Sequence, residues 1–117
     1  MEALKRVFDL CAIAAGAEVR WSYWREGVQI CRLYGDGISG PAAALLRYAP
    51  NAEVPMHKHT GYEHVLVLSG TQQDAEGVYG TGTLVVNPPG SRHRVCAPGG
   101  CTVLVVWERP VILVGDR

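Results

Sequence analysis

The sequence lacks any apolar run that approaches the roughly 18 residues needed to cross a membrane as a helix. It also lacks an excess of charge of either sign, because 11 Lys and Arg residues balance 11 Asp and Glu residues. The four cysteines form neither a CxxC pair nor a zinc-finger spacing. Nothing here indicates a nucleic-acid or a membrane partner, and we expect neither.

The start of the chain has two features of an export signal. Lys5 and Arg6 precede an apolar stretch, and the small residues at 15–17 imitate a cleavage site. Asp9 interrupts that stretch, which is short even without the interruption. We therefore expect a cytoplasmic protein.

The composition favours one compact β domain. Hydrophobic residues make up 48% of the 117 residues, which is enough for one packed core, whereas two domains of this total length would each be marginal. The 14 glycines and 7 prolines favour many turns between short strands over a helical bundle. We expect a single domain over 1–117, with a first layer of strands over 1–38 and an all-β sandwich or barrel core over about 41–109.

Short segments between turn residues predict the strands themselves. They are 6–10, 28–35, 43–49, 53–59, 62–69, 83–87, 92–96, 101–108 and 111–114. The stretch 10–17 is rich in alanine and also fits a short helical turn, so this segment stays open.

Two segments are predicted as connections. Residues 71–77 form a polar connection, and 97–100 form a tight hairpin loop. Cys96 and Cys101 flank that loop, so a closed hairpin would place them opposite each other, within reach of a disulfide. In a cytoplasmic protein we expect both as free thiols.

Three of the four histidines fall into a pattern with one glutamate. His57 and His59 alternate on one predicted strand, so their imidazoles point to the same face. Glu63 begins the next strand, and His93 follows a Pro-Pro-Gly turn much later. Three imidazoles and one carboxylate suit a divalent transition metal and leave coordination positions open. Spacing alone leaves a second interpretation open, in which these are ordinary strand histidines.

Two stretches of the chain resemble the paired motifs of the cupin family. The stretch PMHKHTGYEHVLVLSG fits the pattern H-x-H-x3-E-x6-G with His57, His59, Glu63 and Gly70. The stretch GTLVVNPPGSRH fits the pattern G-x5-P-x-G-x2-H with Gly82, Pro88, Gly90 and His93.

Two positions depart from that family pattern. Asn51 stands where a glycine is usual, and asparagine tolerates the left-handed backbone conformation. Ala97 stands where an asparagine is usual, but that position is not a metal ligand. Neither departure removes a ligand from the implied site.

The finer resemblance, over most of 20–108, is to the cupin domain of the anti-sigma factor ChrR and its stand-alone relatives. It implies a cupin barrel, which is a double-stranded β-helix or jelly roll, with one divalent transition metal such as Zn, Fe, Mn or Ni. The implied ligands are His57, His59, Glu63 and His93. Residues 1–38 do not resemble the separate zinc-binding domain with which ChrR holds its sigma factor, so anti-sigma activity is not implied.

The resemblance implies a small-molecule ligand or substrate at the metal and leaves two functions open. One is a module that binds or senses a small molecule or an oxidant. The other is an iron- or manganese-dependent dioxygenase, or a related oxidoreductase, that acts on a small carbonyl or enol compound. Glu63 is committed to the metal and no other inward acid or base is visible, so no catalytic residue is assigned.

Strand alternation predicts which neighbours of the site face the interior. The expected inward residues are Pro55, Val65, Val67, Ser69 and Val95. The expected outward residues are His64, Arg92 and Arg94. The facing of three further candidates stays open: Tyr48, Met56 and Trp107.

The first layer and the chain ends favour a homodimer. Trp21, Tyr23 and Trp24 are expected in the core or in a dimer interface. Residues 7–10 and 111–114 are candidate edge strands for pairing between two subunits.

Overall fold

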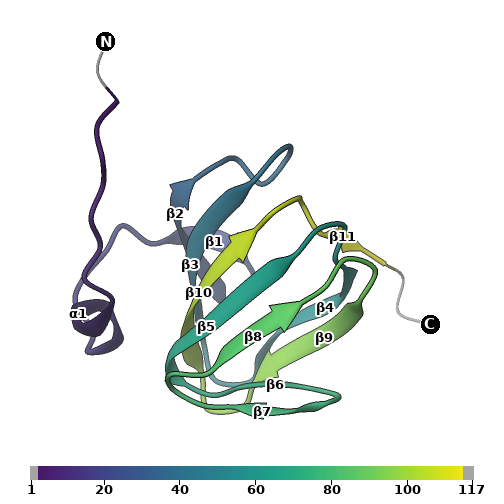
Figure 1. Cartoon of the computed structure of the whole chain (residues 1–117). Coiled ribbons are helices and arrows are strands. Elements are labelled where there is room, and N and C mark those ends of the chain that lie inside the picture. Colours follow the sequence, from purple (N-terminus) through teal and green to yellow (C-terminus); the bar gives the residue numbers. More distant parts are fainter. Residues whose placement is uncertain (1–2, 115–117) are drawn as a thin grey trace.

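The computed structural model describes residues 3–114, and in that range it contains eleven strands and one short helix (Figure 1). The helix is α1 (Leu10–Ala14). The strands are β1 (Ser22–Arg25), β2 (Val28–Tyr34), β3 (Ala42–Tyr48), β4 (Ala52–Lys58), β5 (Glu63–Gly70), β6 (Gln72–Asp74), β7 (Gly77–Tyr79), β8 (Leu84–Asn87), β9 (Arg92–Ala97), β10 (Cys101–Trp107) and β11 (Ile112–Leu113). The outermost ends of the predicted domain 1–117 lie outside the described residues.

The strands form two antiparallel sheets that face each other. One sheet has the order β1-β2-β3-β10-β5-β8, and the other has the order β11-β4-β9-β6-β7. The chain passes between the sheets seven times, from β3 to β4, β4 to β5, β5 to β6, β7 to β8, β8 to β9, β9 to β10 and β10 to β11. This is the connectivity of a jelly roll, and it confirms the predicted all-β barrel.

The inner faces of the two sheets enclose the main core. Val65 and Val67 of β5 and Val103 of β10 are buried there, and Val95 of β9 faces them from the other sheet. Each buried valine stabilises the fold by about 1.5–3 kcal/mol relative to an exposed one. The predicted inward facing of Val65, Val67 and Val95 is confirmed.

A β-bulge on β4 makes the predicted facing of Pro55 wrong. Val54 lies opposite Val95 and His57 lies opposite His93, so three residues of β4 advance against two of β9. The inward alternation that starts at His57 therefore breaks before it reaches Pro55. Val54 is the buried residue of this segment.

A second irregularity, between β5 and β10, makes the predicted inward facing of Ser69 wrong. Along β5 and β10, Val67 lies opposite Val103 but Ser69 lies opposite Thr102, so Leu68 is the extra residue. Leu68 packs on the outer face of the sheet. Ser69 is half-buried and is not part of the inner core, contrary to the prediction.

A smaller apolar cluster covers the outer face of the six-stranded sheet. The side chain of Asp9 accepts a hydrogen bond of 3.0 Å from the backbone N–H three residues later and caps the start of α1. Ile13 of this helix packs against Leu45 of β3 and Leu68 of β5. The helical alternative for this stretch is thus confirmed, and the predicted strand over 6–10 is wrong.

The first layer also differs from the prediction. β1 was not predicted, and it pairs with β2 at the edge of the sheet. Trp24 of β1 packs on Trp107 with a centroid distance of 6.5 Å, whereas Tyr23 is 78% exposed. Trp21 lies beneath the Arg47 guanidinium, at 4.5 Å from the ring centroid.

Neither predicted connection forms as expected. Residues 71–77 contain β6 and the start of β7, which pair as a short hairpin. Residues 97–100 do not close a hairpin, because β9 and β10 belong to different sheets. Cys96 lies opposite Gln73, whereas Cys101 lies opposite Gly70. All four cysteines are free, and burial raises the pKa of Cys101 to about 12.

The expected intersubunit strands have other roles. Residues 7–10 form no strand, and 111–114 include β11, which pairs with β4 of its own chain. Within residues 3–114, the only helix is far too short to cross a bilayer.

Candidate metal centre

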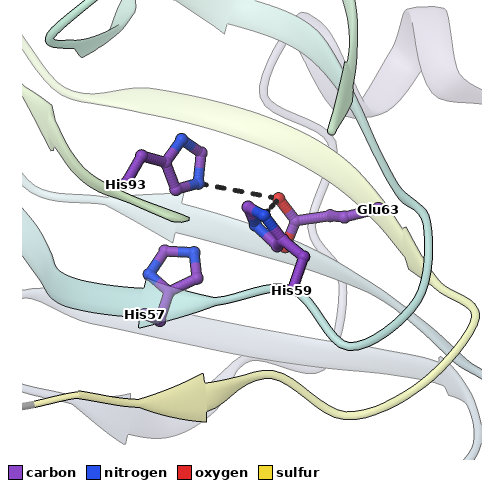
Figure 2. Close-up of side chains that lie close together, drawn as sticks. All are labelled: His57, His59, Glu63 and His93. Atoms are coloured by element: carbon purple, nitrogen blue, oxygen red, sulfur yellow. Dashed lines mark ion pairs between the residues drawn. The ribbon is translucent and has the colours of Figure 1, made fainter. Parts of the chain in front are cut away.

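The four predicted ligands come together between the two sheets. His57 on β4 and His93 on β9 lie opposite each other in one sheet, and Glu63 projects from β5 in the facing sheet. His59 lies in the segment that carries the chain from β4 across to β5. The atoms that these residues can offer a metal all lie within 4.8 Å of one another (Figure 2). Residues from three parts of the sequence thus form one compact donor set.

Backbone hydrogen bonds fix the segment that carries His59. Its N–H donates to the Ser91 carbonyl at 2.9 Å, and its carbonyl accepts from the Gly90 N–H at 2.8 Å. Gly90 has φ 90°, a conformation that favours glycine. The glycine of the second motif therefore helps to place a histidine of the first.

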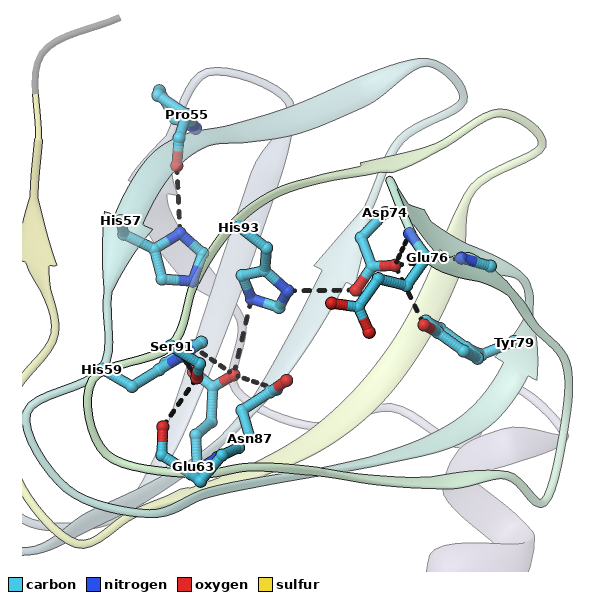
Figure 3. Close-up of polar contacts among 12 residues, drawn as sticks. Pro55, His57, His59, Glu63, Asp74, Glu76, Tyr79, Asn87, Ser91 and His93 are labelled. Carbon is cyan, nitrogen blue, oxygen red and sulfur yellow. Dashed lines mark hydrogen bonds and ion pairs between the residues drawn. The ribbon is translucent and has the colours of Figure 1, made fainter.

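In His57 and His93, one ring nitrogen already serves a hydrogen-bond acceptor. His57 Nδ1 lies 3.0 Å from the carbonyl oxygen of Pro55. His93 Nδ1 lies 3.1 Å from Oδ2 of Asp74 (Figure 3). A carbonyl and a carboxylate can only accept, so each neutral ring carries its proton on Nδ1. The Nε2 lone pair of each ring is thereby left for another partner.

The neutral ring of His59 also carries its proton on Nδ1, and here the acceptor is a hydroxyl. Ser91 Oγ donates to the Pro88 carbonyl at 2.6 Å, so it must accept from His59 Nδ1 at 2.8 Å. His59 Nε2 is buried, and no hydrogen-bond donor among the described residues reaches it. It lies 3.1 Å from Oε1 of Glu63, and His93 Nε2 lies 3.8 Å from the same oxygen. Two acceptors at such a distance repel unless a cation lies between them.

Glu63 is held in place from both sides. Asn87 Nδ2 donates to Oε1 at 3.0 Å, and Trp107 Nε1 donates to Oε2 at 2.7 Å. Burial raises the pKa of Glu63, but in acid His59, His57 and His93 can take up a second proton, and their hydrogen bond and charges then outweigh burial and hold this pKa below its ordinary value. Glu63 is therefore the anionic member of the set.

Burial favours the neutral form of His57. It lowers the pKa of His57, and the nearby His93 and His59 lower it further, against the opposing effects of Pro55 and Glu63. Neutral imidazole is the form that binds a metal. The three rings meet edge to face, with centroids 4.6 to 5.0 Å apart. This packing fits three nitrogens that converge on one point.

A small cavity adjoins the donor set inside the barrel. Its volume is about 30 Å³, which is room for roughly two water molecules. Tyr48 and Trp107, whose facing the sequence left open, both line it, whereas Met56 does not. Burial raises the pKa of Tyr48 far above its ordinary value, so its hydroxyl stays neutral. The rest of the apolar wall is formed by Trp24, Leu46, Val54, Val65, Val95, Val105 and Val111.

A larger groove of about 800 Å³ reaches the centre from outside. His93 and Asn87 line it, together with Asp74 and Met56. The side chain of His93 is 11% exposed, which makes it the candidate ligand nearest to solvent.

The residues predicted to face away from the site do so. His64 is exposed, and its ring stacks on Tyr62 with a centroid distance of 6.5 Å. Arg92 and Arg94 are exposed on either side of His93. The alternation expected around Glu63 and His93 is confirmed.

Sequence reasoning missed the residues that hold the ligands. Asp74 was assigned to a connection, although its spacing to Gly77 is typical of a tight turn. Asn87 reaches Glu63 because the two lie opposite each other in β8 and β5. Ser91 stands two residues before His93, inside the second motif. That position was the one sequence signal that could have pointed to Ser91 as a partner of the site.

A jelly-roll barrel with three histidines and a glutamate between its sheets has the architecture of a cupin. The chain belongs to the family of the ChrR cupin-like domain, whose family model matches residues 11–111. The resemblance inferred from the two motifs is thus confirmed.

Two solved structures are similar in sequence as well as in fold. The structure of Rhodobacter sphaeroides SigE in complex with the anti-sigma ChrR matches with 29% identity and a TM-score of 0.69, over 78% of this chain and 49% of that chain. A protein with a cupin-like fold from Ralstonia eutropha matches with 27% identity and a TM-score of 0.65, over 70% of this chain and 55% of that one. The aligned part is about half the length of each of these two chains.

A third structure is similar in fold alone. The acetylacetone dioxygenase of Acinetobacter johnsonii has a TM-score of 0.75 over 99% of this chain and 86% of that chain, with 13% identity. The comparison with curated proteins gave no match.

Proposed function

We propose that this chain binds one divalent transition metal ion through His57, His59, Glu63 and His93, and that it binds or senses a small molecule or an oxidant there. Zn, Fe, Mn and Ni all fit the proposal, because imidazole nitrogens with one carboxylate oxygen accept each of them. Four protein ligands leave one or two coordination positions for an exogenous ligand.

One observation carries the proposal. His59 Nε2 is buried without a donor and lies 3.1 Å from a carboxylate oxygen, while its Nδ1 proton is committed to Ser91. A buried lone pair against an anion is costly in a structure that leaves it unpaired. A metal ion bound by both groups would remove this cost, because the lone pair and the carboxylate would then both be ligands of one cation.

The surroundings favour a small ligand. The cavity of about 30 Å³ is mostly apolar and has room for a molecule of the size of water, dioxygen or peroxide. A bound ion would supply a Lewis acid or a redox centre. Trp107 and Asn87 would keep the Glu63 carboxylate oriented, and the valines of the wall would limit the entry of water.

The test is the metal content of the purified protein. Protein prepared without chelators and analysed for metals should carry close to one divalent ion per chain. A folded protein with a stoichiometry near zero after supplementation with each of the four metals would contradict the proposal.

A second candidate is an iron- or manganese-dependent dioxygenase that acts on a small carbonyl or enol compound. The groove of about 800 Å³ favours it, because this volume suits an organic substrate and the groove reaches the ligand His93. Oxygen uptake by the iron-loaded protein with a panel of small enols would support this function. No uptake across the panel, with zinc as the native metal, would support the binding or sensing module instead.

We also propose one domain over 1–117, a homodimer and a cytoplasmic location. The near-zero net charge favours association, and the edge strand β8 exposes Leu84 and Val86. The free cysteines are compatible with a reducing compartment. Light scattering that gives the mass of one chain at every concentration would contradict the dimer.

A further inference from the structure

The three histidines of the centre differ in the group that holds their second ring nitrogen. His57 is held by a backbone carbonyl and His59 by a hydroxyl, both of which are neutral. His93 is held by a carboxylate, since its Nδ1 lies 3.1 Å from Oδ2 of Asp74. His93 is also the most exposed of the three histidines. The histidine that solvent reaches most easily therefore has the strongest second partner.

The β6–β7 hairpin fixes the carboxylate of Asp74. Its Oδ1 accepts hydrogen bonds from the Glu76 N–H at 2.9 Å, the Gly77 N–H at 3.2 Å and the Tyr79 hydroxyl at 2.9 Å (Figure 3). Its Oδ2 is turned toward His93. Three donors on one oxygen leave the carboxylate little freedom to rotate, so the second oxygen is aimed at the ring.

We propose that Asp74 is a positioning residue that selects the tautomer of His93 with the proton on Nδ1 and the lone pair of Nε2 toward Glu63. The consequence for metal affinity rests on the proposed metal-binding function, but the choice of tautomer does not. Partners of this kind orient a histidine ligand and raise its basicity.

A purely structural role for Asp74 makes a different prediction. The turn uses only Oδ1, and an asparagine in its place could keep all three of those hydrogen bonds with its amide oxygen. The amide NH2 would then replace Oδ2 and would point a proton at Nδ1 of His93. The ring could accept this proton only by moving its own proton to Nε2, where the metal binds. The opposite amide orientation would set the NH2 against three donors. Asp74→Asn should therefore keep the turn intact while it changes the tautomer of His93.

The first experiment reads the tautomer directly in the metal-free protein. Ring nitrogen shifts of His93 in 15N-labelled protein should show the proton on Nδ1 in the wild type and on Nε2 in Asp74→Asn. Glu76→Gln is the matched control, because it removes a charge from the same hairpin while the backbone N–H that bonds Asp74 remains. It should leave the wild-type tautomer. A wild-type His93 protonated on Nε2, or an unchanged tautomer in Asp74→Asn, overturns the proposal.

The second experiment measures metal affinity by competition titration with Zn²⁺ and Co²⁺. Asp74→Asn should lower the affinity by about 10–100-fold, the usual effect of losing the partner of a histidine ligand, and Glu76→Gln should leave it unchanged. If the wild type binds neither ion, the proposed function fails, and the tautomer experiment still decides the role of Asp74. If the wild type binds and Asp74→Asn binds equally well, the proposal for Asp74 fails and the proposed function stands.

Discussion

The two faces of the six-stranded sheet pack against different kinds of partner. On β5, Val65 and Val67 face the inner cluster, which ends at the buried carboxylate of Glu63. On the same strand, Leu66 and Leu68 face the outer cluster, which is made of apolar side chains under α1. The inner face thus holds a charge in a place that water scarcely reaches, at a cost that only a partner offsets. The side chains of the outer cluster need only pack together and exclude water from that part of the sheet.

This difference separates the effects expected of mutations. A change among the inner polar groups should alter metal binding more than it alters the fold. A change in the outer cluster should alter the free energy of unfolding and leave the folded site as it was.

The largest effect on binding is expected at the ligands. His57→Ala and His93→Ala each remove one nitrogen of the proposed ligand set, so each should lower metal affinity more than the roughly 10–100-fold that the loss of a ligand's partner costs. His64→Ala should leave the affinity nearly unchanged, because His64 is exposed on the opposite face of β5. Metal titration of the three variants checks this.

The opposite result would have a clear meaning. If His64→Ala loses the metal while His93→Ala keeps it, the ligand assignment is wrong. Chelation by neighbouring residues of 57–64 would then be the better account.

The outer cluster should show the reverse behaviour. Leu45 is fully buried against Ile13 and Leu68, so Leu45→Ala should lower the free energy of unfolding by about 2–5 kcal/mol. The folded fraction should bind metal as the wild type does. Ile38→Ala is the control, because Ile38 is 81% exposed and belongs to neither apolar cluster, and it should cost less than about 0.5 kcal/mol. Urea titrations measure both; loss of metal binding in folded Leu45→Ala would show that the two faces are coupled.

Acid should act on the inner face and not on the apolar outer cluster. The pKa of His57 is lowered in the folded metal-free protein, so below about pH 6.5 the unfolded chain takes up a proton that the folded chain refuses. Stability is therefore full above that pH and is lost as the pH falls toward the folded pKa. Glu63, whose pKa is also lowered, adds a loss of the same sign below about pH 4.3.

Each such group changes stability by at most about 1.4 kcal/mol per pH unit. Unfolding measured across this pH range should show a smaller slope in His57→Ala than in the wild type. Leu45→Ala should keep the wild-type slope at a lower overall stability. Equal slopes in the wild type and His57→Ala would contradict the assigned shift.

Period-two alternation and motif spacing predicted what depends on a single strand. They predicted that the four candidate ligands converge inside the barrel, that His64 faces outward and that Val65 and Val67 are buried, because adjacent side chains of a regular strand point to opposite faces. They failed at Pro55, because a bulge adds one residue and reverses the alternation without a mark in the sequence.

Contacts between residues of two different strands could not be predicted from the sequence. Asp74 contacts His93 across β6 and β9, which share one paired position, Gln73 with Cys96. The polar composition of 71–77 indicated a turn but could not indicate which neighbour the turn would meet. The hairpin expected at 97–100 failed for the same reason, since a short turn signal does not tell whether the chain stays in its sheet.

The smallest effect is expected at Asn51, where the first motif departs from its usual glycine. Asn51 has φ 67°, and its N–H donates to the Ala97 carbonyl at 2.8 Å. Asn51→Gly relieves the left-handed strain but adds freedom to the unfolded chain, so stability should change by less than about 1 kcal/mol. Asn51→Ala keeps the strain without the tolerance of asparagine and should cost about 1 kcal/mol. Neither variant removes a donor of the centre, so metal affinity should stay at the wild-type value, measured by the same titration. A loss of affinity in Asn51→Gly would mean that the Asn51 side chain helps to position the metal centre. The loop that carries it would then matter to the site as well as the two faces of the sheet.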